Sequence, residues 1–225
     1  MRTTLSLFDC DGTLFTAQFG RGLLAYVHSH ASRRRALSYY AAVLPLYVLR
    51  KLRLISAEDF NRPVIANLGR LIAGWDLDKG RQAFEWVLHE YLWPTRNPAV
   101  LERLAEHQAR NHRVVLLSGI FVPCLQILGG QLGAREVIGT EPEVLDGKYT
   151  GRILPPVVTG REKLPVLRKY IAELGLDVDW GSSYAYADSA YDRQVLEACG
   201  NPVAVHPDPG LFAIAEANGW EVLRD

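Results

Sequence analysis

The sequence predicts an α/β protein with a parallel β-sheet and a helical segment inserted after the first strand. Short apolar runs typical of buried strands alternate with helical patterns from residue 97 onward. Residues 18–93 show helical periodicity and none of the alternation that is typical of strands. The chain has 225 residues, of which 48% are hydrophobic and 22% charged, so it can hold one core domain with a sizeable insert, or two small domains.

The first strand is predicted over residues 4–8, and it runs directly into Asp9, Asp11 and Gly12. Burying two carboxylates together at a strand end costs on the order of several kcal/mol unless a cation or hydrogen bonds compensate for the lost hydration. Two acids one residue apart suit a Mg²⁺ site for phosphate chemistry, because one can attack phosphorus while the other moves a proton. On these residues alone, an Asp-x-Asp-Gly turn without any chemistry is the alternative.

The helical insert contains one stretch that resembles a membrane segment. Residues 36–49 are apolar, and basic residues lie on both sides of them, Arg33–Arg35 before and Arg50–Lys51 after. The stretch is too short to span a bilayer, which needs about 20 apolar residues, and we expect Pro45 to interrupt it. We interpret it as two helices that pack inside the insert and expect no membrane contact; an interfacial helix that contacts anionic lipid is the alternative.

The remaining chain is predicted to alternate between helices and strands. We expect Ser56 to cap a helix of the insert and residues 84–91 to form another, closed by Trp93–Pro94. We then expect, in order, a helix over 98–110, a strand over 113–117, a helix from 123, a strand over 136–138, a hairpin with an Asp-Gly turn over 143–150, a helix over 161–174, a strand over 183–187, and a strand, helix and strand over 202–205, 209–217 and 220–223. Sites in such folds lie outside the carboxyl ends of the strands, where Asp9, Ser118 and Asp188 all fall.

Charge and cysteine content limit the class of protein. Twenty-five basic and twenty-five acidic residues give no net charge, so we expect no nucleic-acid partner. The three cysteines lack metal-binding spacing, which favours free thiols in a reducing compartment. The start of the sequence lacks the pattern of a signal peptide, so we expect a cytoplasmic protein. The sequence gives no indication of oligomeric state.

Four short motifs carry a family resemblance. They are Asp9-Cys10-Asp11-Gly12-Thr13-Leu14, Leu117-Ser118-Gly119, Gly160-Arg161-Glu162-Lys163, and Tyr186-Ala187-Asp188-Ser189-Ala190-Tyr191-Asp192. In this order they resemble the motifs of haloacid dehalogenase-like (HAD) phosphatases, subfamily IB, the phosphoserine phosphatase-like branch. The run from Asn201 to Asp208 is similar to that branch too, with His206 in place of an Asn. The resemblance implies a Rossmann-like core domain over residues 1–16 and 94–225, with an inserted helical C1 cap over 17–93.

The resemblance also implies roles for the motif residues. Asp9 would attack phosphorus to form an aspartyl-phosphate, and Asp11 would protonate the leaving alcohol and then deprotonate water. Ser118 and the N–H group of Gly119 would bind a phosphoryl oxygen, and Lys163 would neutralise the charge of the phosphoryl group.

The implied cofactor is Mg²⁺. Its ligands would be the carboxylates of Asp9 and Asp188 and the main-chain carbonyl of Asp11. Asp192 would either bind the metal through water or orient Lys163.

The substrate is expected to be a small phosphorylated metabolite. Phosphoserine enzymes of this branch carry a Glu where this chain has Gln18, and a cap Arg where the nearest match, the run from Phe60, ends in Asn67; Arg62 lies close by in sequence. Losing these charges would remove an ion pair and a bidentate clamp, so we predict that phosphoserine is not the best substrate. The alternatives are a phosphoserine phosphatase proper, a phosphotransferase with the same phospho-Asp chemistry, and a membrane-associated binding module.

Overall fold

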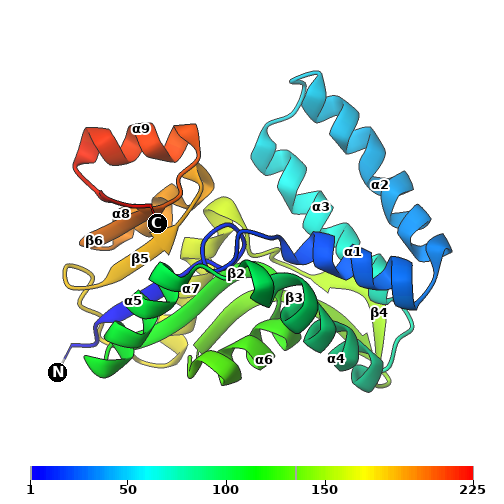
Figure 1. The fold of residues 1–225 in the computed structure, drawn as a ribbon, viewed down its shortest axis with the longest axis horizontal. Coiled ribbons are helices and arrows are strands. Elements are labelled where there is room, and N and C mark those ends of the chain that lie inside the picture. Colours follow the sequence, from blue (N-terminus) through cyan, green and yellow to red (C-terminus); the bar gives the residue numbers. More distant parts are fainter. Residues whose placement is uncertain (1, 135, 225) are drawn as a thin grey trace.

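The computed structural model describes residues 2–134 and 136–224. Within these residues, a seven-stranded sheet has the order β4-β3-β2-β1-β5-β6-β7, and every neighbouring pair is parallel except β3 and β4 (Figure 1). The strands are β1 (Leu5–Phe8), β2 (Arg113–Phe121), β3 (Glu136–Leu145), β4 (Lys148–Leu154), β5 (Tyr184–Ala187), β6 (Asn201–Val205) and β7 (Glu221–Leu223). The predicted parallel α/β architecture is confirmed.

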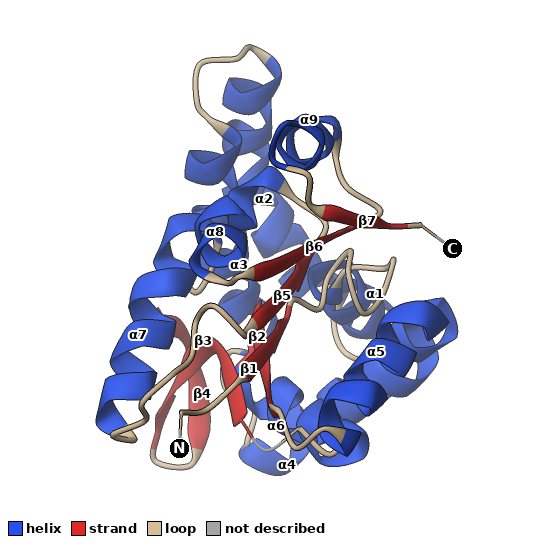
Figure 2. Ribbon diagram, turned by 90° about the vertical axis from the view of Figure 1, so that its left-hand side faces the viewer, coloured by secondary structure: helices blue, strands red, loops and turns tan. Residues whose placement is uncertain are grey.

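Helices cover both faces of the sheet (Figure 2). They are α5 (Pro98–Ala109) and α6 (Val122–Leu132) on one face, and α7 (Lys163–Glu173), α8 (Arg193–Ala198) and α9 (Pro209–Asn218) on the other. The central strand β1 is buried on both sides, because Leu5 and Leu7 pack toward the second group of helices and Phe8 toward the first. This is why three of the four residues of the strand are large and apolar, Ser6 being the exception.

The insert between β1 and α5 is helical, as predicted. It consists of α1 (Phe19–His30), α2 (Arg33–Lys51), α3 (Ala57–Ile72) and α4 (Leu77–Trp86), followed by a π-helical segment (Val87–Leu92) and a 3₁₀ turn (Trp93–Thr95). Ser56 caps α3 as expected, since its hydroxyl accepts a hydrogen bond of 3.0 Å from the Asp59 N–H. Helices α2 and α3 form a hairpin that projects away from the sheet (Figure 1).

The expectation that Pro45 interrupts the apolar stretch was wrong. Helix α2 runs through Pro45 without a break. A proline inside a helix removes one hydrogen bond and crowds the carbonyl four residues earlier, here that of Ala41. Pro45 and Ala41 are both exposed, so solvent can hydrate the freed carbonyl, and the packing of α2 on α3 keeps the helix together. Within the described residues, no helix combines the length and the apolar character needed to cross a bilayer.

The insert shares a hydrophobic cluster with one face of the sheet. Phe19 of α1 lies edge-on to Phe121 at the end of β2, with ring centroids 5.3 Å apart, and Phe84 of α4 contacts Phe121 and Tyr149. Aromatic packing of this kind holds the insert against the sheet. The division into a core over 1–16 and 94–225 and a cap over 17–93 stays a prediction.

Strands β2, β3 and β4 are longer than predicted, and β4 ends at Leu154 instead of residue 150. Strand β2 continues beyond residue 117 to Phe121, with a register shift against β3 between Leu117 and Phe121. Strand β3 extends past residue 138 into the hairpin with β4, whose turn is Asp146-Gly147, as predicted, with φ values of 50° and 72°. The irregular end of β2 places Ser118 and Gly119 beside the end of β1.

Candidate active site

Asp9 follows β1 at the centre of the carboxyl edge of the sheet. Its N–H group donates to the carbonyl of Tyr186 in β5, at 3.0 Å, so the ladder of strands extends to this residue. Strand β1 lies between β2 and β5, and therefore Ser118 in β2 and Asp188 directly after β5 flank Asp9. The carboxylate of Asp9 is buried and makes an ion pair with one cation.

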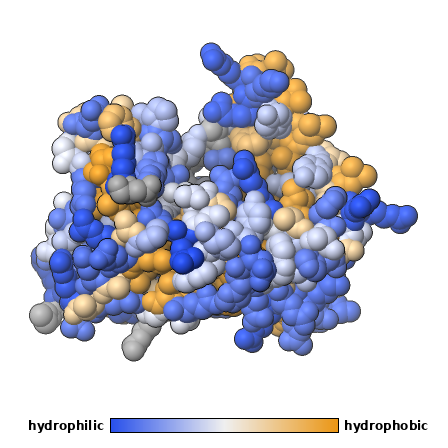
Figure 3. Space-filling view, viewed as in Figure 1, coloured by the Kyte–Doolittle hydropathy of each residue, from blue (hydrophilic) through white to orange (hydrophobic). Residues whose placement is uncertain are grey.

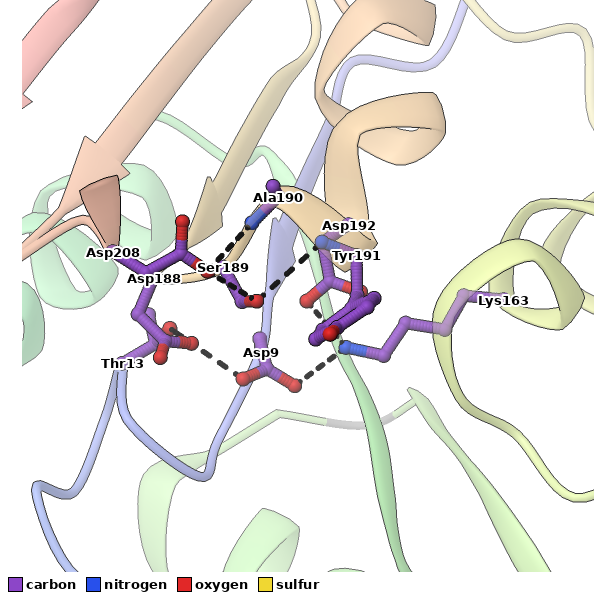
Figure 4. A network of polar contacts seen from close by, with 9 residues as sticks. All are labelled: Asp9, Thr13, Lys163, Asp188, Ser189, Ala190, Tyr191, Asp192 and Asp208. Carbon is purple, nitrogen blue, oxygen red and sulfur yellow. Dashed lines mark hydrogen bonds and ion pairs between the residues drawn. The ribbon is translucent and has the colours of Figure 1, made fainter. Parts of the chain in front are cut away.

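That cation is Lys163, at the first residue of α7. Its ammonium nitrogen lies 2.6 Å from Oδ1 of Asp9 and 2.7 Å from Oδ2 of Asp192, and all three side chains are buried (Figure 4). Burial alone lowers the pKa of Lys163, but the charges of Asp192 and Asp9 outweigh it and raise the pKa, so the side chain stays charged. The structure thus places Asp192 against Lys163, which corresponds to the second of its two expected roles.

Thr13 lies between the carboxylates of Asp9 and Asp188. Its hydroxyl oxygen is 3.3 Å from Oδ1 of Asp188 and 3.5 Å from Oδ2 of Asp9 (Figure 4). Gly12, immediately before it, has a φ of +92° and packs directly against the Asp188 side chain. Sequence reasoning assigned no role to Thr13 or Gly12, although both belong to the first motif.

Asp11 points toward the start of α1. Its Oδ1 accepts a hydrogen bond of 2.9 Å from the N–H group of Phe19, the first residue of that helix. Burial raises the pKa of Asp11 to about 7; the Phe19 N–H opposes this shift, and the charges of Asp9 and Asp188 add to it. Near neutral pH, Asp11 can therefore both hold and release a proton, as a general acid and base must.

The buried carboxylates of the site carry more negative charge than Lys163 balances. Burial, with the charge of Asp9, raises the pKa of Asp188 to about 7, and burial raises that of Asp192 to about 6 despite the contact with Lys163. These shifts measure how poorly the carboxylates tolerate ionisation together. An added cation would relieve this repulsion.

Mg²⁺ fits these residues. Asp9 and Asp188 offer carboxylate oxygens on either side of Thr13, and Mg²⁺ prefers such hard ligands. No group of three or more His, Cys, Asp or Glu side chains in the described part of the chain is arranged to hold a metal ion, and the side chain of Asp11 is turned to Phe19. A donor set of the Asp9 and Asp188 carboxylates and the main-chain carbonyl of Asp11 needs only two acidic side chains, so it is consistent with these observations.

Ser118 and Gly119 lie in β2, on the side of β1 that is opposite to β5 and Asp188. The Ser118 side chain is buried and hydrogen-bonded to the thiol of Cys10, whose pKa burial raises, so the thiol stays protonated. A Cβ atom added to Gly119 would lie 3.1 Å from Cδ1 of Ile65, on α3. The helical insert therefore reaches the site, and it presents an apolar side chain there.

The residues expected to set specificity, Gln18, Arg62 and Asn67, lie on the insert. Among the described residues, no hydrogen bond joins them to the acids of the site. Gln18 precedes α1 and makes no side-chain capping bond. The Asn67 amide donates to the carbonyl of Pro63 within α3, at 2.8 Å, and Arg62 is exposed on the same helix.

Asp208 is a supporting residue that sequence reasoning quoted but did not interpret. Its carboxylate accepts hydrogen bonds from Oγ of Ser189 (2.8 Å) and from the N–H groups of Ala190 and Leu211, and its own N–H donates to the carbonyl of Asp188 (Figure 4). Asp208 thus ties the loop after β5 to the start of α9. The Asp-Pro pair at 208–209 was the available signal, because it is typical of a helix start.

Comparison with known proteins identifies similar chains. The model of the haloacid dehalogenase-like hydrolases matches residues 7–197. A probable phosphatase of Mycobacterium tuberculosis (strain ATCC 25618 / H37Rv) is 29% identical over 226 residues, which cover 98% of this chain and 75% of that protein. A histidinol-phosphatase of Neisseria meningitidis serogroup C (strain 8013) is 25% identical, with 98% of each chain covered.

Solved structures share the fold. A protein of unknown function from Bordetella pertussis Tohama I matches with a TM-score of 0.83 and 24% identity, covering 100% of this chain and 99% of that one. A substrate-bound phosphoserine phosphatase matches with a TM-score of 0.66 and 18% identity, covering 100% of this chain and 94% of that one.

Proposed function

The chain belongs to the haloacid dehalogenase-like hydrolase family, and we propose that it is a Mg²⁺-dependent phosphatase that hydrolyses a small phosphomonoester through an aspartyl-phosphate on Asp9. The observation that carries this proposal is the 2.6 Å ion pair between the buried Asp9 and Lys163, which holds the Asp9 carboxylate in place at the end of β1. An ionised carboxylate needs no base to activate it as a nucleophile.

In the first half-reaction, one carboxylate oxygen of Asp9 attacks phosphorus, and the bond between phosphorus and the ester oxygen breaks. Asp11 donates its proton to the departing oxygen, and its raised pKa of about 7 keeps enough of the protonated form at neutral pH. Lys163 and the hydroxyl of Ser118 stabilise the charge on the transferring phosphoryl group.

In the second half-reaction, water attacks phosphorus of the aspartyl-phosphate. Asp11, now ionised, accepts the proton of the water, and the bond between phosphorus and the Asp9 oxygen breaks. Inorganic phosphate leaves, and Asp9 is restored as a carboxylate. Asp192 keeps the ammonium group of Lys163 in place through both steps, since it holds the nitrogen at 2.7 Å.

Asp9, Asp188 and the carbonyl of Asp11 are the proposed Mg²⁺ ligands. When bound, the ion supplies positive charge that screens the carboxylates and the phosphate from one another. Thr13 and Gly12 hold Asp188 in position for this task.

The proposed substrates are small phosphomonoesters other than phosphoserine. Of the two relatives, one is named a probable phosphatase, and the other a histidinol-phosphatase, a name that denotes action on a small phosphate ester. The uncharged Gln18 and Asn67, with Ile65 above Gly119, favour a substrate that lacks the paired ammonium and carboxylate groups of phosphoserine.

Trapping the covalent intermediate tests the mechanism. Acid quenching during turnover, followed by peptide mass spectrometry, should show one added phosphoryl group on the peptide that contains Asp9. A peptide that is never phosphorylated during turnover would argue against the mechanism. Adding a small alcohol during turnover separates hydrolysis from phosphotransfer, because a phosphotransferase would form the new ester in preference to inorganic phosphate.

A further inference from the structure

Helix α2 exposes an apolar stripe on its outer side. The stripe consists of Leu37, Tyr40, Leu44, Tyr47 and Val48, which recur at intervals of three or four residues and so lie on one face of the helix. Leu37 and Leu44 are 68% and 61% exposed. A surface helix normally turns such a stripe toward the core. Here the core side is occupied by other residues, among them the buried Ala36 and Tyr39.

The turn that joins α2 to α3 continues this apolar surface. Leu52 and Leu54 are 62% and 66% exposed, and the exposed cations Arg50, Lys51 and Arg53 alternate with them. In the space-filling view, the projecting hairpin at the upper right combines a large hydrophobic area with strongly hydrophilic side chains (Figure 3). Apolar patches of this kind mark interaction sites in soluble proteins.

The charge of this segment is one-sided. From Gly12 to Ala57 the sequence contains no Asp or Glu, whereas the chain as a whole has equal numbers of acidic and basic residues. The basic residues of the segment are Arg21, Arg33, Arg34, Arg35, Arg50, Lys51 and Arg53. Arg35 is engaged internally, with the carbonyl of Ala73 and the ring of Trp75. The exposed cations lie before and after the stripe, so its apolar centre has positive ends.

We propose that the outer face of α2 and the turn at 52–56 bind the surface of an anionic lipid bilayer. The exposed leucines would enter the boundary between headgroups and acyl chains, and the Arg and Lys side chains would contact lipid phosphates. Tyr40 and Tyr47 suit the same boundary, because a tyrosine ring is apolar along its body and polar at its tip. The contact is peripheral and requires no helix that crosses the bilayer.

A second copy of the chain fits this surface less well. In a twofold pairing the same patch meets itself, so an antiparallel match of two α2 helices would place Arg33 of one against Lys51 of the other. Like charges brought together oppose such a contact. The inference takes up the alternative weighed from sequence, an interfacial helix that contacts anionic lipid. The expectation of two helices in this stretch was wrong, because α2 is a single helix, and its apolar side is not covered by the insert.

Vesicle co-sedimentation of the full chain tests the apolar part of the proposal. Phosphatidylcholine vesicles with and without phosphatidylglycerol serve as probes, and binding should require the anionic lipid and fall as salt rises. The double variant Leu44→Asp/Leu52→Asp should lose most of the binding. Leu174→Asp, which changes an exposed leucine at the end of α7, is the matched control and should bind as wild type.

The charge requirement has its own pair of variants. Arg50→Gln/Lys51→Gln should weaken partitioning into anionic vesicles by about tenfold or more, given the usual contribution of each cation at a lipid surface. Arg168→Gln/Lys169→Gln removes two adjacent exposed cations of α7 and should leave partitioning unchanged. Both pairs lie at exposed positions, and an unchanged thermal midpoint will show that each variant is folded.

Three results would overturn the proposal: no binding to anionic vesicles at low salt, binding that survives Leu44→Asp/Leu52→Asp, and self-association in solution that the same variant abolishes. The last would assign the patch to a second copy of the chain. The test does not depend on the proposed function, because binding is measured without substrate, and hydrolysis of a water-soluble aryl phosphate should be unchanged in these variants.

Discussion

The carboxylate of Asp188 occupies the space that a side chain at position 12 would need. A Cβ atom built on Gly12 would lie 2.2 Å from Oδ2 and 2.4 Å from Cγ of Asp188. Gly12 also has a φ of +92°, a backbone conformation that other residues rarely adopt. The glycine of the first motif is therefore required for two reasons, its backbone angle and the close approach of Asp188, which follows β5.

Gly12→Ala should displace Asp188 and reduce phosphatase activity by about 100-fold or more, since an error of about 1 Å in a catalytic group has that effect. The Mg²⁺ concentration for half-maximal activity should rise as well. Gly147→Ala is the control: its φ is +72°, but a Cβ there meets nothing within 4 Å. We expect it to lower the free energy of unfolding by about 1 kcal/mol and to leave activity unchanged. Equal activity of the two variants would contradict this view of Gly12.

Lys163→Met should leave Asp9 and Asp192 without their shared cation. Activity toward an aryl phosphate should fall by about 100- to 1,000-fold, as for the loss of other charge-stabilising groups. Stability without metal at pH 7 should fall by about 3 kcal/mol or more, because removing one partner leaves buried charges unpaired. Lys169→Met changes an exposed lysine of the same helix, 79% exposed, and should affect neither property. A Lys163→Met variant that retained activity within about threefold of wild type would exclude the proposed role.

The stability of the metal-free protein should depend on Asp188 and on pH. The folded-state pKa of Asp188 is about 7 against an ordinary value of 3.8, so its protonated form favours folding, and this contribution is lost as pH rises from about 4 to about 7. Asp188→Asn has no such loss. Its stability relative to wild type should therefore improve by about 1–3 kcal/mol between pH 5 and pH 8, measured by urea unfolding in a chelator.

Magnesium provides the complementary test of the same site. Mg²⁺ should raise the thermal midpoint of the wild type at pH 8 and have little effect on Asp188→Asn. Asp177→Asn, at an exposed acid that pairs with Arg2, should behave as wild type in both experiments. A wild-type midpoint that Mg²⁺ leaves unchanged at pH 8 would argue against the proposed ligands.

Substrate preference can be measured with a panel of phosphomonoesters. We expect kcat/KM for phosphoserine to be lower than for less charged esters, because Gln18 and Asn67 cannot form the ion pair and clamp that its ammonium and carboxylate groups need. Histidinol phosphate and an aryl phosphate belong in the panel. Phosphoserine far ahead of every other ester would show that the missing charges are supplied elsewhere in the insert.

The parallel sheet and the meeting of the acids at its carboxyl edge could be anticipated from local sequence. Asp9, Ser118 and Asp188 each directly follow an apolar run in the sequence, and parallel strands align their carboxyl ends. The burial of Lys163 could not be inferred from its neighbours in sequence, because a single lysine near a helix start is usually solvated. Its contact with Asp192 depends on how α7 and the loop before α8 pack, which is a tertiary property.

The insert was the less predictable part. Helical periodicity showed that the insert is helical, but not where each helix begins and ends. The effect of Pro45 on α2 depends on whether the carbonyl four residues earlier is exposed to solvent, which local sequence does not determine. Likewise, residues 36–49 are apolar on all sides, so periodicity could not show which side of α2 packs on α3 and which faces solvent. Asp208 was marked by the helix-start signal of Asp-Pro, but its contact with Ser189 joins two loops that are distant in sequence.

The most direct test of the central claim is hydrolysis of an aryl phosphate by the wild type and by Asp9→Asn, each with and without Mg²⁺. We expect the wild type to require Mg²⁺, and Asp9→Asn to lose activity by about 1,000-fold or more at any Mg²⁺ concentration, because the amide is no nucleophile and a weak metal ligand. Asp59→Asn, at an exposed acid of α3, controls for the substitution itself. Activity that persists in Asp9→Asn would contradict the assignment of Asp9 as the nucleophile, and with it the proposed mechanism.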